Sequence, residues 1–359
     1  MGHVRRNATA ENRRLRPVNI IAFQFNKLGD NIAFVPAIQA LRQRCRDCHI
    51  TILTTPASAE LYMGPLGPQE VIVGTKRGFE KSYRRPWNLA LWMWRVRRQH
   101  PDACLVSFDQ GSVALLAAKL SGAGIRIGGK LECARIKGAL TEEIPIPEDS
   151  RPVTWHWRMA RALAKSCGGD EEWPEDSPPP DLRHLLSRGA RPKGSRRRVV
   201  IHSGASRYLN QWPSENFASV AKSLSGDFDV VWITHGGTTG AAPPGIFGAQ
   251  VNSLSEFAEW LASADLFVGN NSGPMHLADA LGCAGVAVTG PSARGWDPYW
   301  YRDRWSVLRH PNLYCAPCEM LSEELAGCTN LDSPMACLKY WTIERVNEEC
   351  RNRLESRVG

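Results

Sequence analysis

A glycine-rich segment in the C-terminal half of the chain carries residue types that bind phosphate. Residues 269–277, Gly-Asn-Asn-Ser-Gly-Pro-Met-His-Leu, follow an apolar run at 265–268 that we expect to be a buried strand. They open a segment at 274–281 with the pattern of a helix, where proline in the first turn costs nothing. Glycine and serine leave backbone N–H groups uncovered at the positive end of the helix dipole. The pattern indicates a phosphate or pyrophosphate site with His276 as an added donor, or else an ordinary turn with a structural histidine.

The chain of 359 residues has a basic balance, with 44 Lys and Arg against 36 Asp and Glu and a formal net charge of +8. The excess is concentrated in the N-terminal tail and in residues 81–98 and 188–198. A basic surface suits anionic partners such as nucleotide sugars, phosphorylated glycans or anionic lipid. We expect no nucleic-acid partner, because the basic residues form no recognised reader motif.

The sequence predicts a cytoplasmic protein. It has no run of 18 apolar residues that could span a membrane, and no apolar stretch typical of a secretory signal precedes residue 18. Eleven cysteines without such a signal favour reduced thiols or metal ligands over a disulfide scaffold.

Predicted strands alternate with predicted helices twice along the chain, which is the pattern of doubly wound α/β domains. The first alternation starts with a strand at 18–25 and a tight turn at 28–31, and a segment rich in proline and charge separates it from the second. We expect a disordered basic tail at 1–17, a first domain at 18–170, a linker at 171–197, a second domain at 198–340 and a C-terminal helix at 341–359. Two such domains predict a cleft between them where ligands bind.

Three motifs occur in order along the chain. They are residues 25–31 with 36–41, residues 202–205 with 212–217, and residues 271–278 with 280–282 and 290–291. Together they resemble glycosyltransferase family 9, the bacterial ADP-heptose heptosyltransferases of lipopolysaccharide core synthesis. The resemblance covers residues from about 18 to 350. It implies a GT-B fold of two Rossmann-type domains facing a cleft, in which the first domain binds the acceptor and the second a nucleotide sugar.

The resemblance also implies inverting transfer, which needs a base for the acceptor hydroxyl and a positive seat for the departing nucleotide diphosphate. Asp30, at the carboxyl end of the first strand, is the candidate base, and its alternative role is to cap the following helix. The candidate donor-binding residues are Ser203, Gly204, Ala205, Arg207, Asn210, Asn271, Ser272, Gly273 and His276. Since no Asp-x-Asp motif stands out, we expect no cofactor for catalysis, with Arg207 or Arg294 supplying positive charge.

Three positions on the donor side depart from the family pattern. Asn271 stands where an acidic residue usually opens the donor motif, Asn210 stands where a lysine is expected, and a glutamate is missing at 235–239. A lost lysine weakens phosphate binding, because charged hydrogen bonds are roughly twice as strong as neutral ones. We expect transfer of heptose from ADP-heptose to a glycan or glycolipid such as lipopolysaccharide core. The departures leave open another donor, another acceptor or a nucleotide-sugar-binding protein without catalysis, and sugar-nucleotide epimerases share the architecture.

Four cysteines near the C-terminus have a spacing that could bind a metal ion. Cys315, Cys318, Cys328 and Cys337 form C-x2-C-x9-C-x8-C. Four thiols in a short segment containing proline predict a structural zinc or iron site, although the last two spacings are longer than those of common zinc ribbons. The alternative is a set of unpaired thiols.

Residues 83–98 mix tryptophan with arginine. This composition is typical of an interfacial helix on anionic lipid, which would place the protein at the inner face of the membrane. An acceptor-binding helix has the same composition. Our expectation is a third arrangement, in which the Trp and Leu face is buried in the core and the arginines lie outside.

Overall fold

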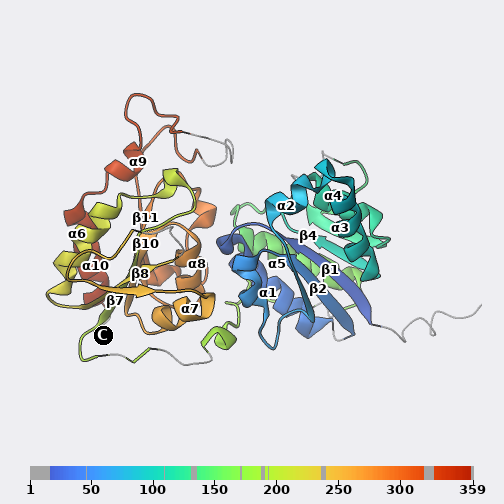
Figure 1. Ribbon diagram of the computed structural model, residues 1–359, viewed down its shortest axis with the longest axis horizontal. Coiled ribbons are helices and arrows are strands. Elements are labelled where there is room, and N and C mark those ends of the chain that lie inside the picture. Colours follow the sequence, from blue (N-terminus) through green and yellow to red (C-terminus); the bar gives the residue numbers. More distant parts are fainter. Residues whose placement is uncertain are drawn as a thin grey trace, which may run out of the picture.

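The protein has two α/β halves, each built on a parallel sheet of six strands (Figure 1). The computed structural model describes residues 17–45, 47–108, 110–130, 136–169, 172–186, 191–192, 194–235, 240–318 and 327–356. The basic tail expected at 1–17 lies outside these residues except for its last position. The pair of doubly wound domains predicted from the sequence is confirmed as the fold class.

The first half has the strand order β3-β2-β1-β4-β5-β6. Its strands are β1 (Val18–Gln24), β2 (Cys48–Thr54), β3 (Glu70–Val73), β4 (Ala103–Val106), β5 (Ile125–Gly129) and β6 (Glu142–Ile144). Its helices are α1 (Leu28–Arg44), α2 (Lys76–Glu80), α3 (Pro86–Arg98), α4 (Gly111–Leu120) and α5 (Pro152–Ser166), with 3-10 turns η2 (Pro56–Tyr62) and η3 (Lys81–Arg84). The central strands are continuous apolar runs because helices cover both faces of the sheet.

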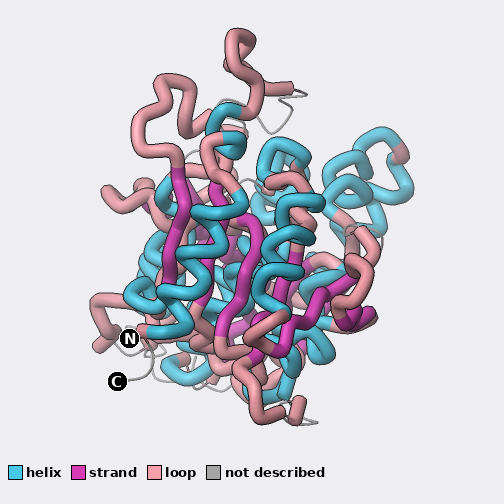
Figure 2. Tube along the Cα trace, turned by 90° about the vertical axis from the view of Figure 1, so that its left-hand side faces the viewer, coloured by secondary structure: helices cyan, strands magenta, loops and turns pink. Residues whose placement is uncertain are grey.

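The second half has the strand order β12-β11-β10-β7-β8-β9. Its strands are β7 (Arg198–His202), β8 (Asp229–Thr234), β9 (Phe247–Gln250), β10 (Leu266–Asn270), β11 (Gly285–Thr289) and β12 (Trp305–Arg309). Its helices are α6 (Ser214–Ser225), α7 (Leu254–Ala262), α8 (Gly273–Ala280), α9 (Ala336–Lys339) and α10 (Ile343–Glu355). Short 3-10 turns are η6 (Tyr208–Asn210), η7 (Arg294–Trp296) and η8 (Arg302–Arg304). Figure 2 views this half from outside, with helices lying over the strands.

The segment between the halves is packed against both of them. Gln39 of α1 exchanges two hydrogen bonds of 2.8 Å with the backbone of Asp181, and Trp157 donates to the carbonyl of Pro174 (2.9 Å). The 3-10 turn η5 (Arg183–Leu186) continues this segment, buries Leu185 and contacts α7. The described part of the expected linker is therefore an ordered segment that packs against both halves.

Three local expectations are wrong. Residues 28–31 are the first turn of α1 and not a tight turn, and Thr54 of β2 donates to Oδ1 of Asn31 (2.8 Å) in that turn. Strands β6, β9 and β12 were not expected, since they are short edge strands of mixed composition. The helix within 83–98 forms as α3, but only Trp92 and Val96 of it are buried. Among the described residues, no helix is long and apolar enough to cross a membrane.

Candidate active site

A cavity of about 660 Å³ lies where the carboxyl ends of the two sheets face each other. Of the residues predicted from the sequence, those that line it are Asp30, Gly204, Ala205, Arg207, Asn210, Asn271, Ser272, Gly273 and His276. Ser203 does not line it. Its side chain is buried beneath the wall and lies 3.3 Å from the hydroxyl of Ser214. The cavity has the size of a small-ligand site and receives side chains from both halves.

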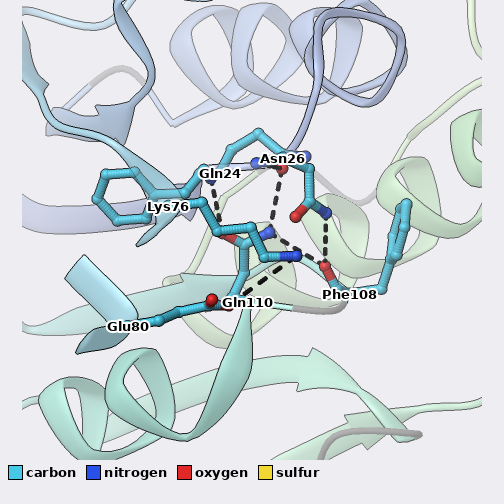
Figure 3. Close-up of polar contacts among 7 residues, drawn as sticks. Gln24, Asn26, Lys76, Glu80, Phe108 and Gln110 are labelled. Atoms are coloured by element: carbon cyan, nitrogen blue, oxygen red, sulfur yellow. Dashed lines mark hydrogen bonds and ion pairs between the residues drawn. The ribbon is translucent and has the colours of Figure 1, made fainter. Parts of the chain in front are cut away.

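A network of side-chain amides holds the loop between β1 and α1 (Figure 3). Gln110 accepts a hydrogen bond from the backbone N–H of Phe25 (2.6 Å) and donates to Oε1 of Gln24 (3.1 Å). Asn26 donates from its backbone to Oε1 of Gln24 (3.3 Å) and from Nδ2 to the carbonyl of Phe108 (3.0 Å). These bonds fix the loop against β1 and the segment before α4, and so determine where α1 begins.

Asp30 is the third residue of α1 and lies in its first turn. The N-cap position belongs to Lys27, whose side chain makes no capping bond, and Asp30 follows three positions later. The next residue, Asn31, donates from Nδ2 to the carbonyls of Asn26 (2.9 Å) and Lys27 (3.0 Å), which anchors this turn. A negative charge in a first turn is stabilised by the helix dipole. Asp30 therefore presents a carboxylate to the cavity from a fixed position.

The first turn of α8 faces the same cavity. Ser272 is the N-cap residue, and its side chain makes no capping bond, so it does not compete for the first N–H groups of the helix. Pro274 follows in the first turn, as expected from the sequence. Burial lowers the pKa of His276 to about 4, so its ring is neutral near pH 7. The turn offers backbone donors, a helix dipole and a neutral imidazole to an anion.

The first turns of α1 and α8 contact each other directly. A Cβ atom added at Gly29 would lie 2.7 Å from Cδ2 of His276, and one added at Gly273 would lie 3.1 Å from Cβ of Leu28. Side chains larger than hydrogen at these two positions would push the helices apart. The glycines therefore allow the carboxylate of Asp30 and the helix start at Ser272 to face one cavity across the boundary of the two halves.

The wall of the second half is fixed by Asn270, the last residue of β10. Its Oδ1 accepts from the backbone N–H of Trp212 (2.9 Å), and its Nδ2 donates to the carbonyl of Ser203 (2.7 Å). Burial lowers the pKa of His202, at the end of β7, to about 4. Asn210 donates to Oγ of Ser292 (3.1 Å), while its buried Oδ1 has no hydrogen-bond partner among the described residues.

Asn271 has a specific partner in the structure. Its Nδ2 donates to Oδ1 of Asp297 (3.3 Å), and the same oxygen pairs with the Arg309 guanidinium at 2.6 Å. Burial raises the pKa of Asp297, and Arg309 opposes that shift. A carboxylate at position 271 would meet this buried carboxylate, whereas the amide donates to it. An amide at position 271 is therefore compatible with the neighbouring carboxylate of Asp297, and an acid at this position would not be.

A carboxylate of the first half reaches the start of a helix in the second. Glu60, at η2, accepts from the backbone N–H groups of Leu254 (3.3 Å) and Ser255 (3.1 Å) and from Oγ of Ser255 (3.0 Å). These residues open α7, so the negative charge lies at the positive end of the helix dipole. Glu60 also lines the cavity and joins its two sides.

The segment that carries α7, β10 and α8 matches a known family. The model of glycosyltransferase family 9 (heptosyltransferase) matches residues 249–327. This range contains Asn271, Ser272, Gly273 and His276. The resemblance to glycosyltransferase family 9 is confirmed. The matched range does not contain Asp30, whose role stays a prediction.

Relatives of this family extend the similarity. The chain is 29% identical over 104 residues to lipooligosaccharide heptosyltransferase 2 of Campylobacter jejuni, which is 29% of this chain and 30% of that protein. A glycosyltransferase family 9 structure from Veillonella parvula superposes with a TM-score of 0.68 at 18% identity, covering 95% of this chain and 98% of the other. The ADP-heptose lipopolysaccharide heptosyltransferase II of E. coli gives a TM-score of 0.65 at 18% identity over 95% and 100%. At these identities the solved structures establish the fold.

The four cysteines of the predicted metal site lie near enough to one another for their thiols to raise the pKa of Cys318 and Cys337. Burial first, and then the thiols of Cys315 and Cys328, raise the pKa of Cys318. Burial and the three other thiols raise the pKa of Cys337 to about 11. Within the described ranges, no group of three or more His, Cys, Asp or Glu side chains is placed to hold a metal ion, so the predicted zinc or iron site is not supported.

Several residues that shape the site were not found from the sequence. Lys27 and Trp296 line the cavity, and the ring of Trp296 lies 6.0 Å from that of His276. Arg294, named above as a source of positive charge, is exposed, and the lining residues do not include it. Lys27 belongs to the motif at residues 25–31, and its positive charge close to the candidate base Asp30 could have identified it as a site residue. Glu60 and Trp296 carried no local signal, because they act across the boundary of the halves.

Proposed function

We propose that the chain is an inverting glycosyltransferase that uses Asp30 as general base and a nucleotide-diphosphate sugar as donor. The family match and the fold support a glycosyltransferase. One observation supports the mechanism above the others, namely the contact that turns the first turns of α1 and α8 toward one cavity. That contact puts a carboxylate and an anion-binding helix start within one site.

The chemistry follows from these two groups. The carboxylate of Asp30 takes the proton of the acceptor hydroxyl, and the oxygen attacks the anomeric carbon of the donor sugar. The new C–O bond forms as the bond to the diphosphate oxygen breaks on the opposite face, so the anomeric configuration inverts. The leaving diphosphate takes the electron pair of that bond. Its charge is stabilised by the backbone donors at Ser272 and Gly273, the neutral ring of His276 and the cation of Arg207.

We propose ADP-heptose as donor and a glycan of the lipopolysaccharide core as acceptor. The matched family is described as heptosyltransferase, and the E. coli enzyme of the same fold is an ADP-heptose lipopolysaccharide heptosyltransferase. The Asn271–Asp297 bond gives the amide at position 271 a partner within the site, where the family pattern has an acid.

A donor panel tests the proposal. Purified protein is incubated with ADP-heptose, ADP-glucose, GDP-mannose or UDP-glucose and a heptose-deficient lipopolysaccharide acceptor, and nucleoside diphosphate and glycosylated product are both measured. We expect transfer from ADP-heptose, and NMR of the product to show the inverted anomeric configuration. Transfer from another donor alone would reject heptose, and a retained configuration would reject Asp30 as base.

A nucleotide-sugar-binding protein without catalysis is the second candidate. It is supported by Asn210, which stands where a lysine is expected and whose buried Oδ1 has no partner in the part of the chain that the structure describes. This candidate predicts that ADP-heptose binds in calorimetry while no donor is turned over with any core acceptor. Turnover of any donor in the panel would reject it.

A further inference from the structure

Helix α3 exposes its apolar side chains, contrary to the expectation that they are buried. The exposed fractions are 69% for Trp87, 43% for Leu91 and 54% for Trp94. These residues are spaced four and three positions apart, so they form one face of the helix. Tyr83, in η3 just before it, is 60% exposed. We call these four residues the α3 face. Large aromatic side chains gathered on one exposed surface mark a site of interaction.

The opposite face of α3 packs against the hydrophobic core of the first half. Trp92 packs edge-on against Phe25, with ring centroids 5.9 Å apart, and against Phe79 at 5.1 Å. Val96 is fully buried in the same cluster. The helix is therefore fixed in its orientation, and the α3 face points outward because of that packing. Figure 1 shows α3 on the side of the first half that lies away from the second half.

The residues around the α3 face are basic. Between positions 81 and 98 there is no acidic residue, and the basic ones are Lys81, Arg84, Arg85, Arg95, Arg97 and Arg98. The Arg84 guanidinium lies 5.9 Å from the ring of Tyr83, and that of Arg98 lies 5.2 Å from the ring of Trp94. Aromatic rings flanked by cations match the boundary of an anionic bilayer, where rings enter the headgroup region and arginines bind phosphate.

We propose that the α3 face docks the protein onto an anionic lipid bilayer, with Trp87, Leu91 and Trp94 inserted and Arg84 and Arg98 bound to lipid phosphates. This goes beyond the proposed transferase activity and does not depend on it. Phe25, which supports α3 through Trp92, precedes the loop held by Gln24 and Gln110 at the cavity. Docking therefore fixes the half of the molecule that carries Asp30 relative to the membrane.

Vesicle binding by the full-length protein tests the proposal. Vesicles contain either phosphatidylcholine alone or equal parts of phosphatidylcholine and phosphatidylglycerol, and bound protein is measured by co-sedimentation. We expect binding to the anionic vesicles, weak binding to the neutral ones, and loss of binding as salt screens the arginines. Brominated lipids should quench tryptophan fluorescence, because Trp87 and Trp94 enter the headgroup region.

Variants separate the α3 face from other surfaces. The double variant Trp87→Ser/Trp94→Ser should bind anionic vesicles at least about tenfold more weakly, since it loses the inserted rings. Arg84→Glu/Arg98→Glu should lose binding and its salt dependence, since it removes both of the cations assigned to lipid phosphates. The matched control is Leu331→Ser, because Leu331 is 85% exposed elsewhere on the surface and should not affect binding. All variants should keep the thermal midpoint of the wild type.

Three results would overturn the proposal. They are absence of binding by the wild type, equal binding to both vesicle types, and normal binding by the double Trp variant. Sedimentation velocity adds a fourth, since a dimer abolished by Trp87→Ser/Trp94→Ser would assign the face to a second copy of the chain. Transfer to a soluble oligosaccharide acceptor reports the catalytic site separately, so failure of docking and failure of catalysis are distinguishable.

Discussion

Asp30 carries the proton transfer at the scale of single residues. The change Asp30→Asn keeps the shape of the side chain and removes the base. We expect kcat to fall by about 10²- to 10⁴-fold, the usual contribution of a general base. The thermal midpoint should change little, because a negative charge in the first turn of a helix contributes only about 0.3–1 kcal/mol. Steady-state kinetics with calorimetric donor binding measure this, and turnover near the wild-type level would remove Asp30 from the mechanism.

Asn271 and Asp297 form a pair that can be exchanged. Asn271→Asp would place a second carboxylate 3.3 Å from the first, so we expect a loss of about 1–3 kcal/mol in unfolding free energy and weaker donor binding. The double variant Asn271→Asp/Asp297→Asn restores one carboxylate and one amide and should recover most of the stability. Chemical denaturation of the three variants measures it. If the single variant is as stable as the wild type, the two side chains do not interact.

The sequence identified the residues of the site that lie in local motifs and missed those that act over long separations. Asp30, Ser272 and His276 each follow a buried strand and open a helix, which is a local pattern. Asp297 acts on Asn271 from 26 positions away, and Glu60 acts on Leu254 from 194 positions away. Such contacts depend on how the sheets are placed, and residue types at one position do not encode that.

Helix α7 depends on a carboxylate from the other half of the molecule. Removing it with Glu60→Ala leaves three donors at the start of α7 without their acceptor. We expect the KM for the donor to rise by about tenfold with a smaller change in kcat, since bonds to charged groups contribute about 1.5–3 kcal/mol. Glu70→Ala is the control, because Glu70 lies on β3 and bonds Gln99 within the first half. Equal KM values for the two variants would contradict this role.

Elements with continuous apolar runs could be predicted, and elements with mixed composition could not. Strand β1 was expected at 18–25 and is Val18–Gln24, because its buried residues on both faces leave one plausible structure. Strand β6 consists of Glu142, Glu143 and Ile144 and pairs only through its backbone with β5, so no side-chain pattern marks it. Helix α3 was expected, but its orientation was not, since both of its faces carry large apolar residues.

The buried His156 and His202 and the half-buried His276 make the stability of the whole molecule depend on pH. Burial lowers the pKa of His156 to about 3 and the pKa values of His202 and His276 to about 4. The unfolded chain binds these protons near pH 6.5, whereas the folded chain binds them only near pH 3 to 4, as the cited shifts imply. Stability is therefore fully present above the unfolded pKa and is lost as the pH falls through this window.

Chemical denaturation at a series of pH values measures this dependence. Each pKa difference of one unit corresponds to about 1.4 kcal/mol, so the unfolding free energy should fall by several kcal/mol as the pH is lowered from about 7 to about 4. The midpoint denaturant concentration should fall steadily over the same range. A midpoint that stays constant from neutral pH down to about pH 4 would show that these rings are not buried as neutral groups.

The close contact of Gly29 with His276 bears on which step limits the rate of the reaction. Because the first turns of α1 and α8 touch, we expect ligand exchange to involve movement of the two halves apart and back, which displaces solvent. We expect kcat to fall as glycerol raises the viscosity of the solution around the protein. A large polymer, which raises only the bulk viscosity, should leave kcat unchanged. A kcat that does not change with glycerol would show that the chemical step limits the rate and that the two halves move faster than that step.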